Sequence, residues 1–483
     1  MSAALLLICL SAASPRVEAK DELTYEEALS CRPAAKPFFN RAWDALANEH
    51  REEARDLFHT ALELDPTCTL AWAHLGALTP GADGEAMLKG AIAGGRGITE
   101  QERLQVLALA AQQKGDHDQA LALTRSALMY DPLSYRLNFE LAQRAGTLNR
   151  WSEMLPAALK ATELQPQRGA AWNQLGYAYL GLGKNQQAVT ALKHYAQVAP
   201  MEANAHDSLG DALLANNQLN DAKAAYQRAL DSSDGTFWLA SEGVATVCAI
   251  QGDWECARSV IEKARNAATK EEDRLGLQAW TAWAFLAEGK ASDAQGAVDQ
   301  FDLDSARTGL QKRMYEARLL RGRMLNAQGK YREALNTVVV LGAQRFSLEN
   351  DQHAVLEAQR LRAMIEAQAR LGKVRDAQTS LARMEKVTAD RQRDPDSLDA
   401  LAHARGLISL QLKDWPAAII AFNRCSEAFD LCKLTLAEAQ EKAGDSEGAK
   451  KTRAKIRAAN HRDPEYWWAR TKAVDPQVRS SAR

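Results

Sequence analysis

Three prolines, Pro132, Pro166 and Pro200, follow one another at intervals of 34 residues. A fixed interval of this length is typical of chains built from small units that stack on one another, because one unit alone buries too little apolar surface. Proline ends helices, since it lacks the backbone N–H that continues the helical hydrogen bonds. The interval therefore predicts helical units that each end near a proline, and it constrains the fold more than the length of 483 residues does.

The residues between these prolines form a more specific pattern than the interval itself. The unit that ends at Pro200 contains Trp172, Leu175, Gly176, Tyr179 and Ala188. Matching positions in other units are Leu209, Gly210, Leu213, Ala222, Tyr226 and Ala229, and, nearer the N-terminus, Ala54, Phe58, Ala61, Pro66, Trp72, Leu75 and Gly76. With these residues the chain resembles the tetratricopeptide repeat family over residues 35–234. The resemblance implies pairs of antiparallel helices held close together by the small residues.

The same rhythm continues more loosely beyond residue 234, where short polar turns precede helices that contain alanine. The turns are Gly252-Asp253, Gly289-Lys290, Gly329-Lys330, Gly372-Lys373, Lys413-Asp414 and Gly444-Asp445. We therefore expect an all-α fold, an α-solenoid of about twelve antiparallel helix pairs between residues 35 and 464. Its parts would be a regular array at 20–234, a degenerate array at 235–464 and a basic C-terminal tail at 465–483.

The N-terminus has the pattern of a secretory signal peptide. An apolar run from Ala3 to Ala13 precedes Val17-Glu18-Ala19, which places small residues before a cleavage site at Lys20. We expect residues 1–19 to be removed and the mature chain to be periplasmic or secreted. No Lys or Arg precedes the apolar run, so an ordinary N-terminal helix is the alternative.

The cysteines favour the same compartment. Removing the signal peptide would remove Cys9 and leave six cysteines. Cys248 and Cys256, like Cys425 and Cys432, would lie across a turn between two helices, and Cys31 and Cys68 would precede the first helices of adjacent repeats. We expect three local disulfides, which suit an oxidising compartment. Six buried, reduced cysteines are the alternative.

The resemblance also implies a concave surface lined by the first helix of each pair. Counting from Trp172, the inner positions are predicted to be partner-binding residues. They are Asn173, Tyr177, Asn204, Asp207, Asp211, Phe139, Gln143, Gln105 and Gln112. Such a groove would bind an extended, basic or polar polypeptide segment, and a solvated helix face is the alternative. Some family members grip a terminal carboxylate with Lys, Asn and Arg at these positions, but Asp207 and Asp211 oppose that here.

Two aromatic clusters lie outside this pattern. Trp280, Trp283 and Phe285 have the spacing of a helix face packed in the core, with a ligand platform as the alternative. Tyr466, Trp467 and Trp468 are expected to cap the open end of the stack, with a partner contact as the alternative. Residues 442–483 contain eleven Lys or Arg against five Asp or Glu. We expect a solvated final helix and a frayed tail there, with contact to an anionic polymer or a membrane surface as the alternative.

Composition and motifs exclude several classes of function. The net charge of -2 argues against a nucleic-acid binder, and no apolar stretch is long enough to form a transmembrane helix. Neither a zinc-ligand spacing nor a nucleophile, metalloprotease or dinucleotide motif is present, so we expect no metal, no cofactor and no enzymatic activity.

The sequence thus predicts a non-catalytic scaffold that binds a protein or peptide partner, in the bacterial envelope. A component of a polysaccharide export or envelope assembly machine is one alternative. A cytoplasmic regulator with an uncleaved N-terminus and an accessory subunit of an enzyme are two more. The sequence leaves the partner and the oligomeric state open.

Overall fold

The computed structural model describes residues 29–95, 97–233, 235–348, 350–389 and 395–474. The expected signal peptide at 1–19 and the last nine residues of the chain, 475–483, lie outside these residues. The chain divides into two compact units, one ending at Ser134 and the other beginning at Tyr135. We describe each unit by itself. The change from regular to degenerate repeats near residue 234 stays a prediction, and the helices on either side of it pack together within the second unit.

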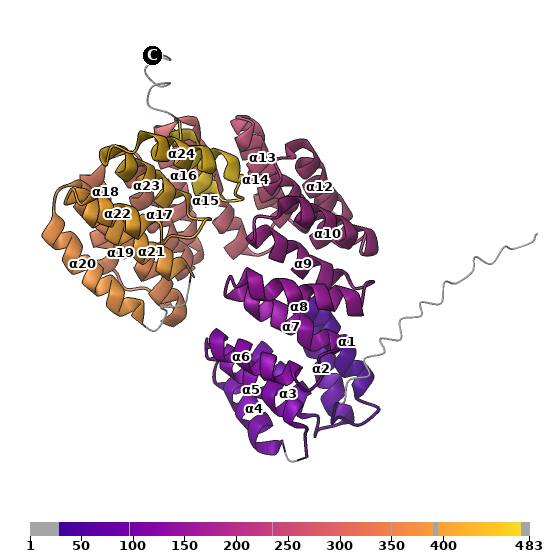
Figure 1. Cartoon of the computed structure of the whole chain (residues 1–483). Coiled ribbons are helices and arrows are strands. Elements are labelled where there is room, and N and C mark those ends of the chain that lie inside the picture. The colour runs from indigo at the N-terminus through magenta and orange to yellow at the C-terminus, as the bar shows by residue number, and fades with distance from the viewer. Residues whose placement is uncertain (1–28, 96, 234, 349, 390–394, 475–483) are drawn as a thin grey trace, which may run out of the picture. The chain divides into compact units, whose positions relative to one another are not determined.

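The first unit consists of three antiparallel helix pairs (Figure 1). Its helices are α1 (Lys36–Ala47), α2 (Arg51–Leu64), α3 (Thr69–Leu78), α4 (Gly81–Gly94), α5 (Glu100–Gln113) and α6 (His117–Leu128).

The second unit consists of nine further pairs and one final helix. Its helices are α7 (Tyr135–Thr147), α8 (Trp151–Leu164), α9 (Gly169–Gly181), α10 (Asn185–Val198), α11 (Ala203–Ala215), α12 (Leu219–Ser232), α13 (Leu239–Ile250), α14 (Trp254–Ala267), α15 (Glu271–Glu288), α16 (Ala291–Thr308), α17 (Gln311–Ala327), α18 (Tyr331–Ala343), α19 (Asn350–Arg370), α20 (Val374–Val387), α21 (Pro395–Gln411), α22 (Trp415–Phe422), α23 (Asp430–Lys442), α24 (Ser446–Ala459) and α25 (Pro464–Lys472). The predicted all-α solenoid is confirmed, and the described residues contain twelve pairs, as expected, with α25 in addition.

The turns inside the pairs explain why the polar dipeptides recur. At Gly252-Asp253 the glycine adopts a φ of 82°, which glycine reaches without a steric penalty. The carboxylate of Asp253 then accepts a hydrogen bond of 3.0 Å from the backbone N–H of Cys256 and caps α14. Asp414 and Asp445 cap the second helices of later pairs in the same way.

Close approach of the helices depends on small residues that face aromatic rings. A Cβ atom added at Gly210 or at Gly243 would lie 2.5 Å from the ring of Tyr226. This buried ring therefore fits between α11 and α13 only because both positions are glycine. The core of the unit consists of such contacts between neighbouring pairs.

Candidate functional site

The segment at 460–474, which we call the C-terminal arm, folds back onto the concave side of the second unit. Asn460 ends α24 in the left-handed conformation, with a φ of 50°. Asp463 caps α25, since its carboxylate accepts a hydrogen bond of 2.6 Å from the backbone N–H of Glu465. These two turns bring α25 against α13, α15 and α23, where Figure 1 shows the C-terminal part of the chain.

Arg462 of the arm binds the acidic residues that the sequence places in the groove. Its Nη1 atom lies 2.9 Å from both carboxylate oxygens of Asp207 and 3.3 Å from Oδ1 of Asp211. Its Nε atom lies 3.8 Å from Oε2 of Glu242, and its Nη2 atom donates a hydrogen bond to the carbonyl oxygen of Leu239. The predicted groove residues Asp207 and Asp211 on α11 therefore lie close together, and a side chain from the same chain binds both of them.

Two tyrosines complete this cluster. Tyr177 donates a hydrogen bond of 2.8 Å to Oδ2 of Asp211, and Tyr226 donates one of 2.7 Å to Oδ1 of the same carboxylate. The guanidinium of Arg462 lies 5.4 Å from the centre of the Tyr226 ring, within the range of a cation–π contact. Burial and the charge of Asp211 raise the pKa of both tyrosines well above 10.0, so they remain hydrogen-bond donors.

Three carboxylates around one guanidinium leave an excess of negative charge. Burial raises the pKa of Asp207 to about 6, and Asp211 adds to the rise while Arg462 opposes it. Burial likewise raises the pKa of Glu242 to about 7, against the opposing charge of Arg462. Burial alone would lower the pKa of Arg462, but Asp211, Asp207 and Glu242 together raise it, so this side chain stays charged.

The raised pKa of Glu242 predicts how stability depends on pH. Between its ordinary value of 4.5 and about 7, the folded chain holds a proton that the unfolded chain has lost. The free energy of unfolding that this group contributes therefore falls as the pH rises through that range. Glu242→Gln, which imitates the neutral form, should stabilise the protein at pH 8 by roughly 1–3 kcal/mol and by almost nothing at pH 4.

Urea unfolding at both pH values checks this prediction. The matched control is Glu255→Gln on the exposed side of α14, which should change the midpoint little at either pH. A gain at Glu242 that is equal at pH 4 and pH 8, or a loss at pH 8, would contradict the electrostatic assignment.

Aromatic residues anchor the rest of the arm. Trp467 is 1% exposed and meets Trp280 of α15 edge to face, with ring centres 5.3 Å apart. Trp468 packs near Trp283, with ring centres 6.4 Å apart. The expectation that Tyr466, Trp467 and Trp468 cap the end of the stack is therefore wrong. They fill the inner side of the middle pairs, because the nine pairs curve enough to bring the chain end there.

An ion pair fixes the start of α25 as well. Oε2 of Glu465 accepts a hydrogen bond of 2.6 Å from Nη2 of Arg323 on α17. The first part of the predicted basic tail, up to Lys472, is therefore an ordered helix. Trp280 and Trp283 belong to the packed interior, as the core interpretation expects, and Phe285 lies 4.6 Å from the guanidinium of Arg258.

The remaining predicted groove residues have diverse surroundings. Gln105 is 3% exposed, and Phe139 is buried beside Tyr135, so neither side chain lines an open groove as expected. Gln112 and Gln143 are exposed. Asn173 is half-buried, and its Oδ1 atom has no hydrogen-bond partner among the described residues. Asn204 donates a bond of 3.4 Å to the hydroxyl of Tyr195.

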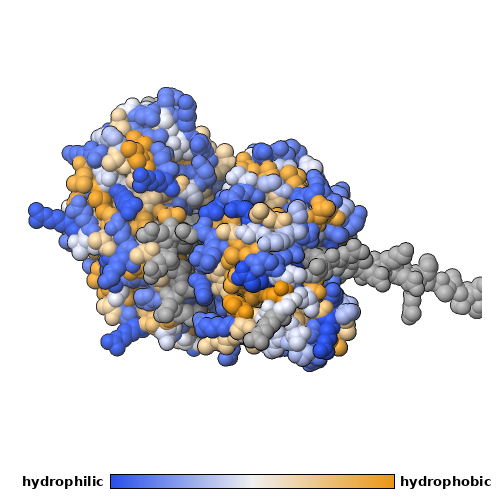
Figure 2. Space-filling view, turned by 60° about the horizontal axis from the view of Figure 1, so that its bottom comes forward, coloured by the Kyte–Doolittle hydropathy of each residue, from blue (hydrophilic) through white to orange (hydrophobic). Residues whose placement is uncertain are grey.

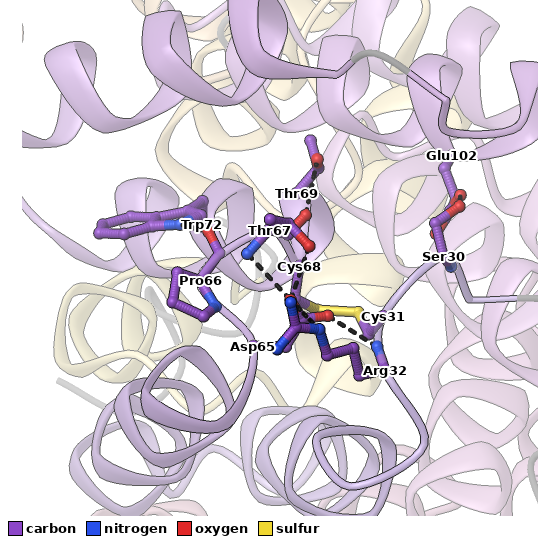
Figure 3. Close-up of a disulfide and its surroundings, with 10 residues drawn as sticks. All are labelled: Ser30, Cys31, Arg32, Asp65, Pro66, Thr67, Cys68, Thr69, Trp72 and Glu102. Atoms are coloured by element: carbon purple, nitrogen blue, oxygen red, sulfur yellow. Dashed lines mark hydrogen bonds and ion pairs between the residues drawn. A yellow bond between two sulfur atoms is a disulfide. The ribbon is translucent and has the colours of Figure 1, made fainter.

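The structure pairs the six cysteines as the sequence suggests, in the bonds Cys31–Cys68, Cys248–Cys256 and Cys425–Cys432. Figure 3 shows that the first bond ties the segment before α1 to the start of α3. Beside it, the backbone N–H of Arg32 donates a bond of 2.6 Å to the buried carboxylate of Asp65. Hydrogen bonds from Thr67 and Arg32 outweigh the effect of burial and lower the pKa of Asp65.

An open groove lies next to the docked arm. It has a volume of about 590 Å³ and is formed by α15, α16, α17, α19 and the start of α25. Trp283, Phe301 and Leu320 contribute its apolar floor, and Lys312 and Gln359 are among its polar residues. We call it the α15–α19 groove. Sequence reasoning missed it, because repeats of this region lack the regular pattern that sets the register.

The part of the chain that the structure describes contains neither a membrane-spanning helix nor a group of side chains arranged to bind a metal ion. No helix there combines the length and the hydropathy needed to cross a bilayer. No group of three or more His, Cys, Asp or Glu side chains there is arranged to hold a metal ion.

Comparisons with known proteins agree with the fold. Residues 169–200 and 208–271 match two family models, each described as tetratricopeptide repeat. Within these two segments the chain thus contains tetratricopeptide repeats, which generally serve as scaffolds for protein interactions. A search of curated proteins gave no match.

Solved structures with similar helices are tetratricopeptide-repeat proteins too. A thermophilic one from Thermus thermophilus is 22% identical, covering 38% of this chain and 99% of its own, with a TM-score of 0.33. One from Parabacteroides merdae is 17% identical, covering 54% and 98%, with a TM-score of 0.40. YrrB, described as having an unusual peptide-binding site, is 16% identical, covering 39% and 96%, with a TM-score of 0.30.

Proposed function

We propose that this protein is an exported, non-catalytic scaffold that holds a segment of a partner polypeptide in the α15–α19 groove. The groove itself carries the proposal. Its volume of about 590 Å³ suits several side chains, and it joins an apolar floor to a polar rim, as ligand sites commonly do. It also lies on the inner side of the repeats, where tetratricopeptide repeats commonly bind their partners.

The docked arm decides which part of the inner surface is open. Arg462 and Trp467 fill the part over α11 to α15, which includes the predicted groove residues Asp207 and Asp211 on α11. Asp463, Pro464 and Glu465 of the arm then form one wall of the open groove. The arm thus contributes to the proposed site in addition to closing the neighbouring surface.

Apolar surface elsewhere supports no competing site as strongly. Figure 2 shows one face of the molecule, on which apolar residues form several separate patches among hydrophilic ones. The most exposed large apolar side chains lie on two turns between helix pairs, with Met129, Tyr130 and Leu133 on one turn and Met201 on the other. Neither turn contributes to the lining of the α15–α19 groove.

The proposal that the chain is exported rests on the three disulfides, which persist in oxidising compartments. The sequence pattern at residues 1–19 agrees with it. The mature N-terminus should then begin near Lys20, and mass spectrometry of the protein from its native host would detect it. A mature chain that retains Met1 would contradict export.

Site-specific photo-crosslinking in the native host tests the groove. A photoreactive residue at Gln359, inside the groove, should form an adduct of one defined polypeptide mass. The matched control is the same residue at Gln378, which is exposed on α20. Equal adducts at both positions, or adducts at Gln378 alone, would contradict the proposed site.

A further inference from the structure

A second pocket lies close to the α15–α19 groove and has different chemistry. Its volume is about 220 Å³, and it shares only Arg323 and Glu465 with that groove. It is lined by residues of α17, α18, α19, α23, α24 and α25, so it is built from both the later repeats and the arm.

Cations outnumber carboxylates in the lining of this pocket. Its five cationic side chains are Arg323, Arg362, Arg370, Arg453 and Lys472, and its three carboxylates are Glu366, Glu438 and Glu465.

Three of the arginines are paired with carboxylates. Arg323 binds Glu465 at 2.6 Å, and Arg370 binds Glu438 through two contacts of 2.8 and 2.6 Å. Arg453 binds a carboxylate outside the lining at 2.7 Å.

Arg362 differs from these arginines. It is 5% exposed, yet within the described part of the chain its guanidinium makes neither a hydrogen bond nor an ion pair. Its one specific contact is the face of the Phe429 ring, 5.3 Å away. Burying a guanidinium without an anionic partner is energetically unfavourable, so its presence in a pocket requires an explanation.

Surrounding charges do not compensate for this burial. Burial lowers the pKa of Arg362, and Arg323 adds to the decrease, while Glu465 and Glu366 oppose it only in part. Burial also raises the pKa of Glu366, which favours its neutral form and leaves the pocket more positive.

We propose that this pocket binds a small oxyanion, with Arg362 as its principal donor. A guanidinium offers planar, forked N–H groups that match the oxygens of phosphate, sulfate or carboxylate. The pocket volume admits such a group free in solution or carried by a small organic molecule. The paired carboxylates around it exclude larger polyanions by repulsion.

Calorimetric titration of the full chain at constant ionic strength tests the proposal. The probes are inorganic phosphate, inorganic sulfate, acetate and glycerol phosphate. At least one should bind in a saturable manner at one site, and preference for glycerol phosphate over inorganic phosphate would identify an organic ligand. Absence of saturable binding for all four probes would overturn the proposal.

Variants assign the binding to this pocket. Arg362→Met keeps most of the side-chain volume and should weaken binding at least tenfold, as loss of a charge-assisted pair predicts. Arg321→Met, which removes an arginine paired with Asp299 outside the pocket, should leave the affinity unchanged. Equal affinities in the two variants would refute the assignment.

A second variant, at an exposed residue, still tests the site if Arg362→Met fails to fold. Lys472→Gln changes an exposed cation at the edge of the pocket and should weaken binding about threefold. An unchanged affinity in this variant, with binding still present, would place the anion elsewhere.

Discussion

Replacing Trp467 by alanine is expected to lower the free energy of unfolding by about 3–5 kcal/mol, the range for large aromatic residues removed from a core. The indole is 1% exposed and belongs to a cluster that includes residues of α11, α13 and α15. Its loss would leave a cavity against Trp280 that rigid helices on both sides could fill only in part.

Trp467→Phe is the matched control for this change. The Nε1 atom of Trp467 has no hydrogen-bond partner among the described residues, so phenylalanine sacrifices no polar contact. It should cost less than half of the loss caused by alanine. Urea unfolding followed by circular dichroism measures both values. A loss below about 1 kcal/mol for alanine would mean that the indole is not buried.

Removing the disulfide between Cys31 and Cys68 should have a comparable effect. The bond closes a loop with a sequence separation of 37 residues. In the chain-entropy account, a loop of this length contributes about 4 kcal/mol by restricting the unfolded chain. Replacing both cysteines by serine should therefore destabilise the first unit by up to this amount.

The bond between Cys248 and Cys256 provides the comparison, because its sequence separation is only 8 residues. The same account gives it about 2.5 kcal/mol. Urea midpoints of the two double variants, each measured without reductant, test the order. A larger loss for the shorter loop would contradict the entropic explanation, and six reactive thiols in the native protein would contradict the pairing itself.

The contacts within a helix pair and between neighbouring pairs could be predicted from the sequence. The interval between prolines and the turns such as Gly252-Asp253 recur because each pair contacts its neighbours in the same way. The two disulfides across turns follow from the same rule. The turn inside the pair α13–α14 places Cys248 near Cys256, and the turn from α22 to α23 of the next pair places Cys425 near Cys432.

Contacts between distant repeats could not be read in the same way. Arg462 and Asp207 are separated by 255 residues, and their meeting depends on the curvature summed over many pairs. Each pair adds a small rotation that no single motif encodes. One signal was available: Tyr466, Trp467 and Trp468 follow the last pair, and three large aromatic residues there need an apolar partner.

The surroundings of the predicted groove residues differ for a related reason. The register counted from Trp172 selects Asp207, Asp211 and Tyr177, which lie close together. Extended to less regular repeats, it selected Gln105 and Phe139, which are buried. Nor could the register reveal that the chain itself supplies a cation to the acidic cluster.

Hydrogen exchange of the backbone amides in α25 tests most directly whether the arm fills the concave side of the second unit. If it does, the amides of Trp468 to Lys472 should exchange as slowly as those in the middle of α15, because both helices share one core. Exchange of these amides within seconds, while α15 remains protected, would contradict this account and leave the surface over α11 to α15 open.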